Sequence, residues 1–148
     1  MAPAGKQRKQ KAPSYSLEGQ VGFLLRQVNQ RHTGIFVQRI GDDLTATQWA
    51  ALAKLHEKGP CTQNLLGRLT AMDAATIKGV VDRLTKRGLT ETELDPDDAR
   101  RLVVLLTDAG QEVVARALPN AVAISEETLA PLTPGERQML IEMRRKLV

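Results

Sequence analysis

Residues 62–110 read TQNLLGRLTAMDAATIKGVVDRLTKRGLTETELDPDDARRLVVLLTDAG, and this stretch decides the fold. Its pattern predicts two short helices joined by a tight turn, then a charged hairpin and the start of a long helix. Asp73 is the predicted N-cap of the second helix, because its carboxylate can accept hydrogen bonds from the free N–H groups of the first turn. Gly88 is its predicted end, since glycine suits the left-handed position after a helix. The apolar residues recur at helical spacing and form one face: Ile77, Val80, Val81 and Leu84.

The opposite face of this helix is small and partly basic. Ala75, Thr76 and Lys78 lie on it, beside Gly79. Glycine inside a helix costs about 1 kcal/mol relative to alanine, which suggests a steric reason for Gly79, such as close approach to a groove. An ordinary amphipathic helix with a solvated outer face explains the same pattern equally well.

The hairpin favours the first interpretation. Two β-prone runs, 89–94 and 102–107, flank a spacer at 95–101 that contains Pro96 and several aspartates, which are turn residues. The spacer places Arg100 and Arg101 at or near an exposed tip. A guanidinium held there by Asp98 suits a narrow minor groove, whose negative potential is enhanced. Two helices followed by a β-wing predict a winged helix-turn-helix, whose second helix reads the major groove.

Several motifs carry a family resemblance. Asp98-Ala99-Arg100, followed by LLTDAG at 105–110, resembles the D-x-R…LT-x-x-G signature of MarR-type transcriptional regulators. Residues 82–84 and 88–89 resemble the end of that family's recognition helix, and the order of elements fits along 16–148. The resemblance implies a dimeric, sequence-specific regulator, more often a repressor, on double-stranded DNA. The residues expected to contact DNA are Arg68, Ala75, Thr76, Lys78, Arg83, Lys86, Asp98, Arg100 and Arg101.

Composition sets the class of protein. The chain has 148 residues, 42% of them hydrophobic and 26% charged, which suits one globular domain. Its net charge of +4 comes from a basic tail, predicted to be flexible, at 1–14. This tail is read as a solubilising end, with a DNA-binding arm as the alternative. The apolar runs are shorter than the ~18 residues of a membrane span, and a single cysteine, Cys61, suits a reducing cytoplasm. Together with the resemblance to MarR-type regulators, this implies a bacterial cytoplasmic protein associated with the nucleoid.

The segments on either side of the winged region are predicted to make a dimer. We expect one MarR-like domain at 15–148, with the DNA-binding part at 45–107 and dimerisation helices at 15–40 and 108–148. The first helix is predicted to start at a Ser16 cap, and the long helix after Thr107 to kink at Pro119. One small domain cannot bury the apolar faces of all these helices, which favours a twofold dimer. Two recognition helices then predict a palindromic operator with half-sites ~10 bp apart.

A ligand site is expected between the first two predicted helices. Arg31 and His32 interrupt the apolar stripe of the first helix, where polar groups need partners. Internal pairing explains them, and so does an acidic ligand. The resemblance implies an effector pocket here for a small aromatic or phenolic acid, with hydroxynicotinate-type acids among the candidates. The candidate pocket residues are Arg31, His32, Phe36 and Trp49, the last of which simple core packing also explains.

Two other classes of function are alternatives to a ligand-responsive regulator. The first is an architectural or protein-binding winged helix without an effector. The second is an enzyme, which the sequence argues against, because it shows no nucleophile–base pair, metal-ligand spacing or glycine-rich phosphate loop. No cofactor or metal is therefore expected. Cys61 is predicted to pack as a small hydrophobic residue rather than to act as a redox sensor.

Overall fold

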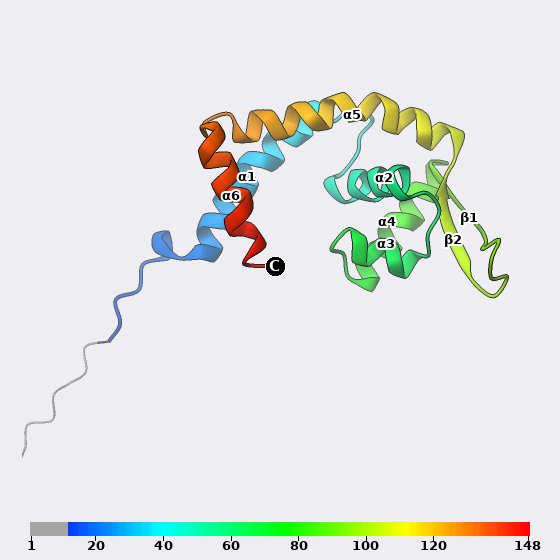
Figure 1. Ribbon diagram of the computed structural model, residues 1–148, viewed down its shortest axis with the longest axis horizontal. Helices are drawn as coiled ribbons and strands as arrows, with labels where there is room; N and C mark the ends of the chain where they lie inside the picture. The colour runs from blue at the N-terminus through cyan, green and yellow to red at the C-terminus, as the bar shows by residue number, and fades with distance from the viewer. Residues whose placement is uncertain (1–11) are drawn as a thin grey trace, which may run out of the picture.

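The computed structural model describes residues 12–148, so most of the predicted basic tail lies outside the described residues. Its elements, in chain order, are η1 (Leu17–Gly19), α1 (Val21–Arg39), α2 (Ala46–Lys58), α3 (Gln63–Leu69), α4 (Ala74–Lys86), β1 (Thr90–Leu94), β2 (Leu102–Leu106), α5 (Asp108–Leu129) and α6 (Pro134–Arg145). Helix α5 spans the molecule (Figure 1). Helices α1 and α6 lie at one end of it, and α2–α4 with the two strands lie below the other end.

The predicted helix-turn-helix is confirmed as α3 and α4. Asp73 Oδ1 accepts a hydrogen bond from the Thr76 amide at 2.7 Å, as an N-cap should. The turn places Ala71 in the left-handed region at φ 56°. Gly88 follows α4 at φ 73°, which glycine adopts without steric cost. The predicted apolar face of α4 is buried, and it fixes which side of the helix remains in solvent.

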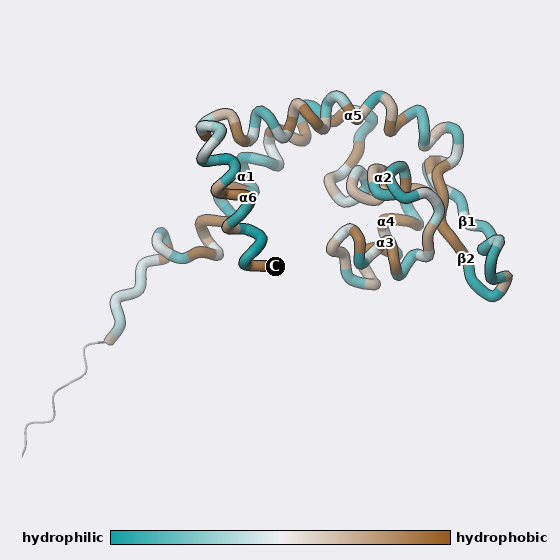
Figure 2. The backbone as a smooth tube through the Cα atoms, in the orientation of Figure 1, coloured by the Kyte–Doolittle hydropathy of each residue, from teal (hydrophilic) through white to brown (hydrophobic). Residues whose placement is uncertain are grey.

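The predicted wing is also confirmed. Its first strand begins one residue later, and its second strand ends one residue earlier, than the β-prone runs 89–94 and 102–107. Strands β1 and β2 pair antiparallel, from Thr90 opposite Leu106 to Leu94 opposite Leu102. Figure 2 shows the apolar strand β2 beside a hydrophilic wing loop. Cys61 adds a short third pairing: its N–H donates to Val104 O at 3.2 Å, and its carbonyl accepts from Val104 N at 2.8 Å. The Cys61 thiol is buried and burial raises its pKa, so the predicted packing role holds.

One prediction for the terminal helices was wrong in detail. Ser16 precedes the short turn η1 rather than the long helix, and its hydroxyl donates to Glu18 Oε2 at 2.6 Å. The backbone is then extended at Gln20, with ψ 133°, so α1 begins only at Val21. Pro119 lies inside α5, which continues through it to Leu129, so the kink expected there stays a prediction. Pro119 lies in the exposed surface, where the loss of one N–H is tolerated.

A single hydrophobic core joins α2–α5, β2 and the C-terminal part of α1. Ile35 and Phe36 of α1 belong to it, whereas several apolar residues earlier in the chain are exposed: Leu17 of η1 and Val21, Leu24, Leu25 and Val28 of α1. Helix α6 likewise exposes Met139, Leu140 and Met143. The two ends of the chain therefore carry apolar surface that one copy leaves in contact with water. Within the described residues, no helix is long and apolar enough to cross a membrane.

Candidate nucleic-acid interface and ligand cleft

The outer face of α4 presents the predicted small and basic residues to solvent. Ala75, Thr76 and Lys78 are all exposed. Lys78 Nζ lies 2.8 Å from Asp82 Oδ2, one helical turn away, and both side chains are at least 60% exposed. An ion pair this exposed is worth little, so Lys78 is free to exchange Asp82 for a phosphate or a base edge.

Further cations surround this face. Arg83 and Lys86 are exposed in the last two turns of α4, and Arg68 is exposed at the end of α3. Arg68 also borders a shallow cavity of about 300 Å³ between α3 and α4, beside the Asp73 cap. These residues place positive charge at the C-terminal end of α4 and at the end of α3, on either side of the exposed face of α4, which suits contacts with phosphates.

Gly79 is not required by packing inside the chain. A Cβ placed there would meet only the Arg83 guanidinium among the described residues, at an ordinary 3.6 Å. Close approach of DNA to α4, the reason suggested by the sequence for a glycine at position 79, therefore stays a prediction.

At the wing tip, Arg100 is held by one carboxylate. Its Nε lies 3.1 Å from Asp98 Oδ1, and its Nη2 lies 3.3 Å from Asp98 Oδ2. The Arg100 amide also donates to Asp98 Oδ1, at 3.1 Å. These contacts lower the pKa of Asp98 and keep it charged. The Arg100 side chain is nevertheless 90% exposed, so the guanidinium is oriented while most of its donors remain available.

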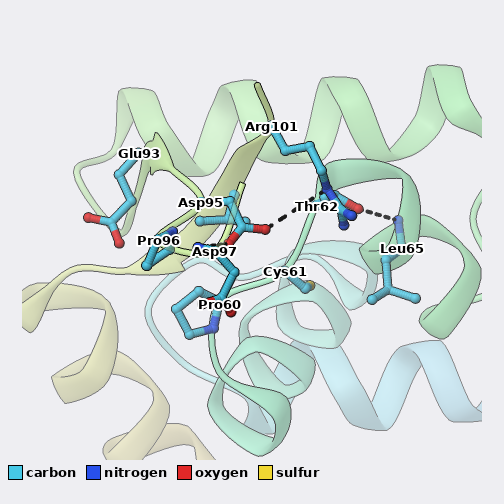
Figure 3. Close-up of a pocket in the computed structure, with 10 residues that line it drawn as sticks. Pro60, Cys61, Thr62, Leu65, Glu93, Asp95, Pro96, Asp97 and Arg101 are labelled. Atoms are coloured by element: carbon cyan, nitrogen blue, oxygen red, sulfur yellow. Dashed lines mark hydrogen bonds and ion pairs between the residues drawn. The ribbon is translucent and has the colours of Figure 1, made fainter. Parts of the chain in front are cut away.

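Arg101 does not share this tip. Its Nε lies 3.9 Å from Asp95 Oδ2, and the two side chains face one another where the tip loop joins the strands (Figure 3). They line a cavity of about 310 Å³ together with Pro60, Cys61 and Leu65 at the start of α3. The sequence placed both arginines at or near the tip, because it could not show that Asp95 and Asp98 each take one of them.

A third cavity, of about 280 Å³, lies between α1 and the start of α2 and is called the cleft below. His32 and Phe36 line it, as expected, with ring centroids 6.4 Å apart. The other lining residues are Asn29, Thr33, Val37, Leu44, Thr45 and Ala46. None of these six was expected from the sequence. Helical spacing could have found Asn29 and Thr33, which lie three residues before His32 and Phe36, and then Val37, four residues after Thr33.

The cleft leaves part of the His32 ring for an occupant. His32 Nδ1 lies 2.9 Å from Thr128 Oγ1, and that hydroxyl donates its own proton to Ile124 O at 2.8 Å. Thr128 therefore accepts from His32, which places the ring proton on Nδ1. The other ring nitrogen is then an acceptor in the neutral ring and a donor in the charged ring.

The remaining two candidates lie elsewhere. Arg31 points to the other side of α1, where its Nη2 donates to Glu127 O at 2.9 Å. It lines a separate apolar groove of about 320 Å³ with Leu132 and Leu140. Trp49 is half-buried against the hydrophobic core and is not part of the cleft lining. The structure thus brings two of the four predicted pocket residues together.

Two helices joined by a tight turn, a β-wing and an exposed basic face define a winged helix-turn-helix protein. The comparisons with known proteins identify the family. The chain belongs to the MarR family, whose model matches residues 44–102.

Full-length relatives agree with this. The chain is 41% identical over 135 residues to the HTH-type transcriptional repressor NicR of Pseudomonas putida, covering 90% of this chain and 85% of NicR. A crystal structure of a probable transcriptional regulator from Pseudomonas aeruginosa is similar, with 53% identity and a TM-score of 0.86 over 90% of this chain and 100% of that one. The structure of Bordetella bronchiseptica BpsR, whose DNA binding is regulated by 6-hydroxynicotinic acid, matches with 38% identity and a TM-score of 0.85 over 91% of this chain and 97% of BpsR.

Proposed function

We propose that the chain is a homodimeric, sequence-specific repressor of the bacterial cytoplasm, released from DNA by a small aromatic acid of the hydroxynicotinate type. The main support for a ligand response is the cleft of about 280 Å³ between α1 and the start of α2, which His32 and Phe36 line. The likeness to the repressor NicR and to the 6-hydroxynicotinic-acid-regulated BpsR supports the sign of regulation and the ligand class.

In this proposal residues 45–107 bind DNA. Helix α4 enters the major groove, where Ala75, Thr76 and Lys78 meet base edges or phosphates. The wing lies over the minor groove, and Asp98 aims Arg100 into it. The phosphate contacts come from Arg68, Arg83, Lys86 and Arg101.

Residues 15–40 and 108–148 make the dimer. Their support is the exposed apolar surface of α1 and α6, where Leu25 is 61% and Met143 is 51% exposed in one copy. A twofold axis through these helices places two α4 helices side by side, so a palindromic operator follows.

The ligand binds between α1 and α2. The cleft lies at the lower end of the roughly 300–1,000 Å³ typical of small-molecule sites, which favours a single-ring acid. The Phe36 ring supplies an apolar face, and the free nitrogen of His32 meets the carboxylate or the ring hydroxyl.

One observation favours the effector-free alternative. Arg31 and His32 both have internal partners, Glu127 O and Thr128 Oγ1, as simple internal pairing predicts. That alternative also requires side chains to fill the pocket, however, and the cleft beside His32 is open.

The test is fluorescence anisotropy with the DNA upstream of the chain's own gene, with salt titrated and a panel of aromatic acids that includes 6-hydroxynicotinic acid. The expected result is salt-sensitive, specific binding that at least one acid releases. His32→Ala should keep operator affinity and weaken the acid response about tenfold, because a buried charge-assisted hydrogen bond is lost. Gln30→Ala, an exposed neighbour on α1 outside the cleft lining, serves as the control. Specific binding that no acid releases would support the effector-free alternative.

A further inference from the structure

Arg87, the residue that ends the predicted recognition helix, reaches across to the loop between α1 and α2. Its Nη2 donates to Asp42 O at 2.5 Å, and its Nη1 donates to Gln48 Oε1 at 3.3 Å and to Asp43 O at 3.5 Å. Asp42 and Asp43 contribute backbone carbonyls here rather than carboxylates. One guanidinium therefore bridges the end of α4 to three acceptors that lie about 40 residues earlier in the chain.

The loop that Arg87 contacts has a special backbone. Gly41, Asp42 and Asp43 have φ values of 79°, 52° and 52°, so two aspartates in succession adopt the left-handed region. Such a conformation persists only where the surroundings hold it. Arg116 of α5 supplies a second constraint, because its Nη2 lies 3.0 Å from Asp42 Oδ1 and its Nε lies 3.4 Å from Asp42 Oδ2.

The same loop runs directly into the cleft. Leu44, Thr45 and Ala46, which follow it, line the side opposite His32. Gln48 joins the two sites through one atom: its Oε1 accepts from the Thr45 amide at 3.2 Å and from Arg87. Gln48 is only 6% exposed, so it has little room to find other partners. A molecule in the cleft that displaces Thr45 must move an acceptor of Arg87.

We propose that Arg87 is the positioning residue that couples the cleft to the DNA-reading helix, through the loop 41–48. A cleft occupant shifts Thr45 and Gln48, Arg87 follows, and the C-terminal end of α4 changes its orientation against the duplex. The inference rests on the proposed function, which supplies the two sites. Its own claim is that Arg87 carries the coupling between them.

A direct DNA contact by Arg87 would give a different result from coupling. If Arg87 only neutralised a phosphate, Arg87→Gln would weaken DNA binding and leave the effect of the acid unchanged. If Arg87 carries the coupling, the affinity for the acid stays near its wild-type value while the acid loses its effect on DNA binding.

The experiment measures a coupling ratio, the operator Kd with saturating 6-hydroxynicotinic acid divided by the Kd without it. We expect a ratio of about tenfold or more in the wild-type dimer and about twofold or less in Arg87→Gln. Calorimetry should find the acid's own Kd within about threefold of wild type. Arg87→Lys keeps the charge but cannot span three acceptors, so its ratio should fall too. A wild-type ratio in either variant overturns the inference.

Arg83→Gln is the matched control. It removes the same charge one turn earlier on α4, from a side chain outside the loop contacts. Because Arg83 is proposed as a phosphate contact, its operator affinity should fall, but its coupling ratio should stay at the wild-type value. A ratio that falls equally in Arg83→Gln would mean that loss of positive charge explains both, which also overturns the inference.

Amide hydrogen exchange separates failure of this inference from failure of the proposed function. If no acid releases the wild-type protein, the effector assignment fails, and exchange decides the role of Arg87. Without any ligand, Arg87→Gln should speed exchange at Leu44 and Thr45 about tenfold, and Arg83→Gln should not. Operator DNA should protect these two amides in wild type and not in Arg87→Gln, because coupling is reciprocal. Unchanged exchange in Arg87→Gln overturns the inference.

Discussion

The Asp98 carboxylate orients the Arg100 side chain at the wing tip, in a position from which it can enter a DNA groove. Asp98 holds Arg100 with two side-chain contacts, yet the arginine is 90% exposed. Part of the entropy cost of ordering a long side chain is therefore met before DNA arrives. Arg101, one residue later, instead faces Asp95, where the tip loop joins the strands.

Arg100→Ala should weaken operator binding by about 10- to 100-fold, the loss expected for one specific arginine contact. The thermal midpoint should stay near wild type, because the side chain lies in solvent. Anisotropy titrations at fixed salt, with circular dichroism for folding, check both points. Arg101→Ala is the comparison: a larger loss of affinity there than in Arg100→Ala would contradict the assignment of the tip.

The individual residues differ in how far the sequence could place them. Asp98 and Arg100 were predictable because the pair is local: a turn residue and a cation two positions apart meet across one loop. The partners of Arg31 and Arg87 were not predictable. Glu127 O and Asp42 O are backbone atoms about 96 and 45 residues away, and every residue has such a carbonyl. No side-chain pattern marks which one is used.

At the scale of elements, the sequence LTDAG marks a joint between the wing and α5. Thr107 Oγ donates to Gly88 O at 2.6 Å and accepts from the Gly110 amide at 3.1 Å, so it caps α5 and fastens it to the end of α4. The Thr107 amide donates to Leu89 O at 3.1 Å. Gly110 packs against that same carbonyl: a Cβ at Gly110 would lie only 2.1 Å from Leu89 O.

Gly110→Ala should therefore lower the free energy of unfolding by at least about 2 kcal/mol, since a backbone carbonyl must move to admit the methyl group. Chemical denaturation with constant protein concentration measures this. Gly135→Ala in α6 is the control, because nothing in the described residues lies within 4 Å of a Cβ there. That change should be neutral or stabilising by up to about 1 kcal/mol. Equal stability of the two variants would show that the joint adjusts freely.

Helix ends were predictable to the extent that a side chain marks them. The Asp73 cap forms as the sequence indicated. Thr45 with Gln48 and Thr133 with Glu136 form capping boxes, and their Thr-x-x-Gln and Thr-x-x-Glu spacing is visible in the sequence. Ser16 caps no helix with its side chain, because its hydroxyl binds the Glu18 carboxylate instead. Pro119 is accommodated inside α5, which packs against α1, α2 and β2.

At the scale of the whole molecule, α5 links two parts that differ in how much of their apolar surface one chain buries. Its first half packs on the core of the winged region, while its far end lies beside α1 and α6. The winged part buries its apolar side chains within one chain. The other part exposes Leu24, Leu25 and Val28 on α1, and three methionine or leucine side chains on α6. An exposed apolar surface of this kind marks an interaction site, and a second copy of the chain related by a twofold axis can bury it against its own α1 and α6.

Leu25→Arg should therefore convert the dimer to a monomer at micromolar concentration. Leu25 is 61% exposed in one chain and is outside the hydrophobic core, so the helical content should stay unchanged. Burying an unpaired guanidinium in each half of an interface costs several kcal/mol. Because a monomer reaches one half-site only, operator affinity should fall by about 100-fold or more. Sedimentation velocity measures the assembly state, and anisotropy measures the affinity.

Gln27→Arg is the matched control on the same helix. Two residues further along an α-helix, a side chain points about 200° away, so the same charge is added on another face of α1, at an exposed position. This variant should remain dimeric and bind the operator with near wild-type affinity. If Leu25→Arg also stayed dimeric, the subunits would have to meet through a different surface. The spacing of the two α4 helices, and with it the palindromic operator, would then need another geometric basis.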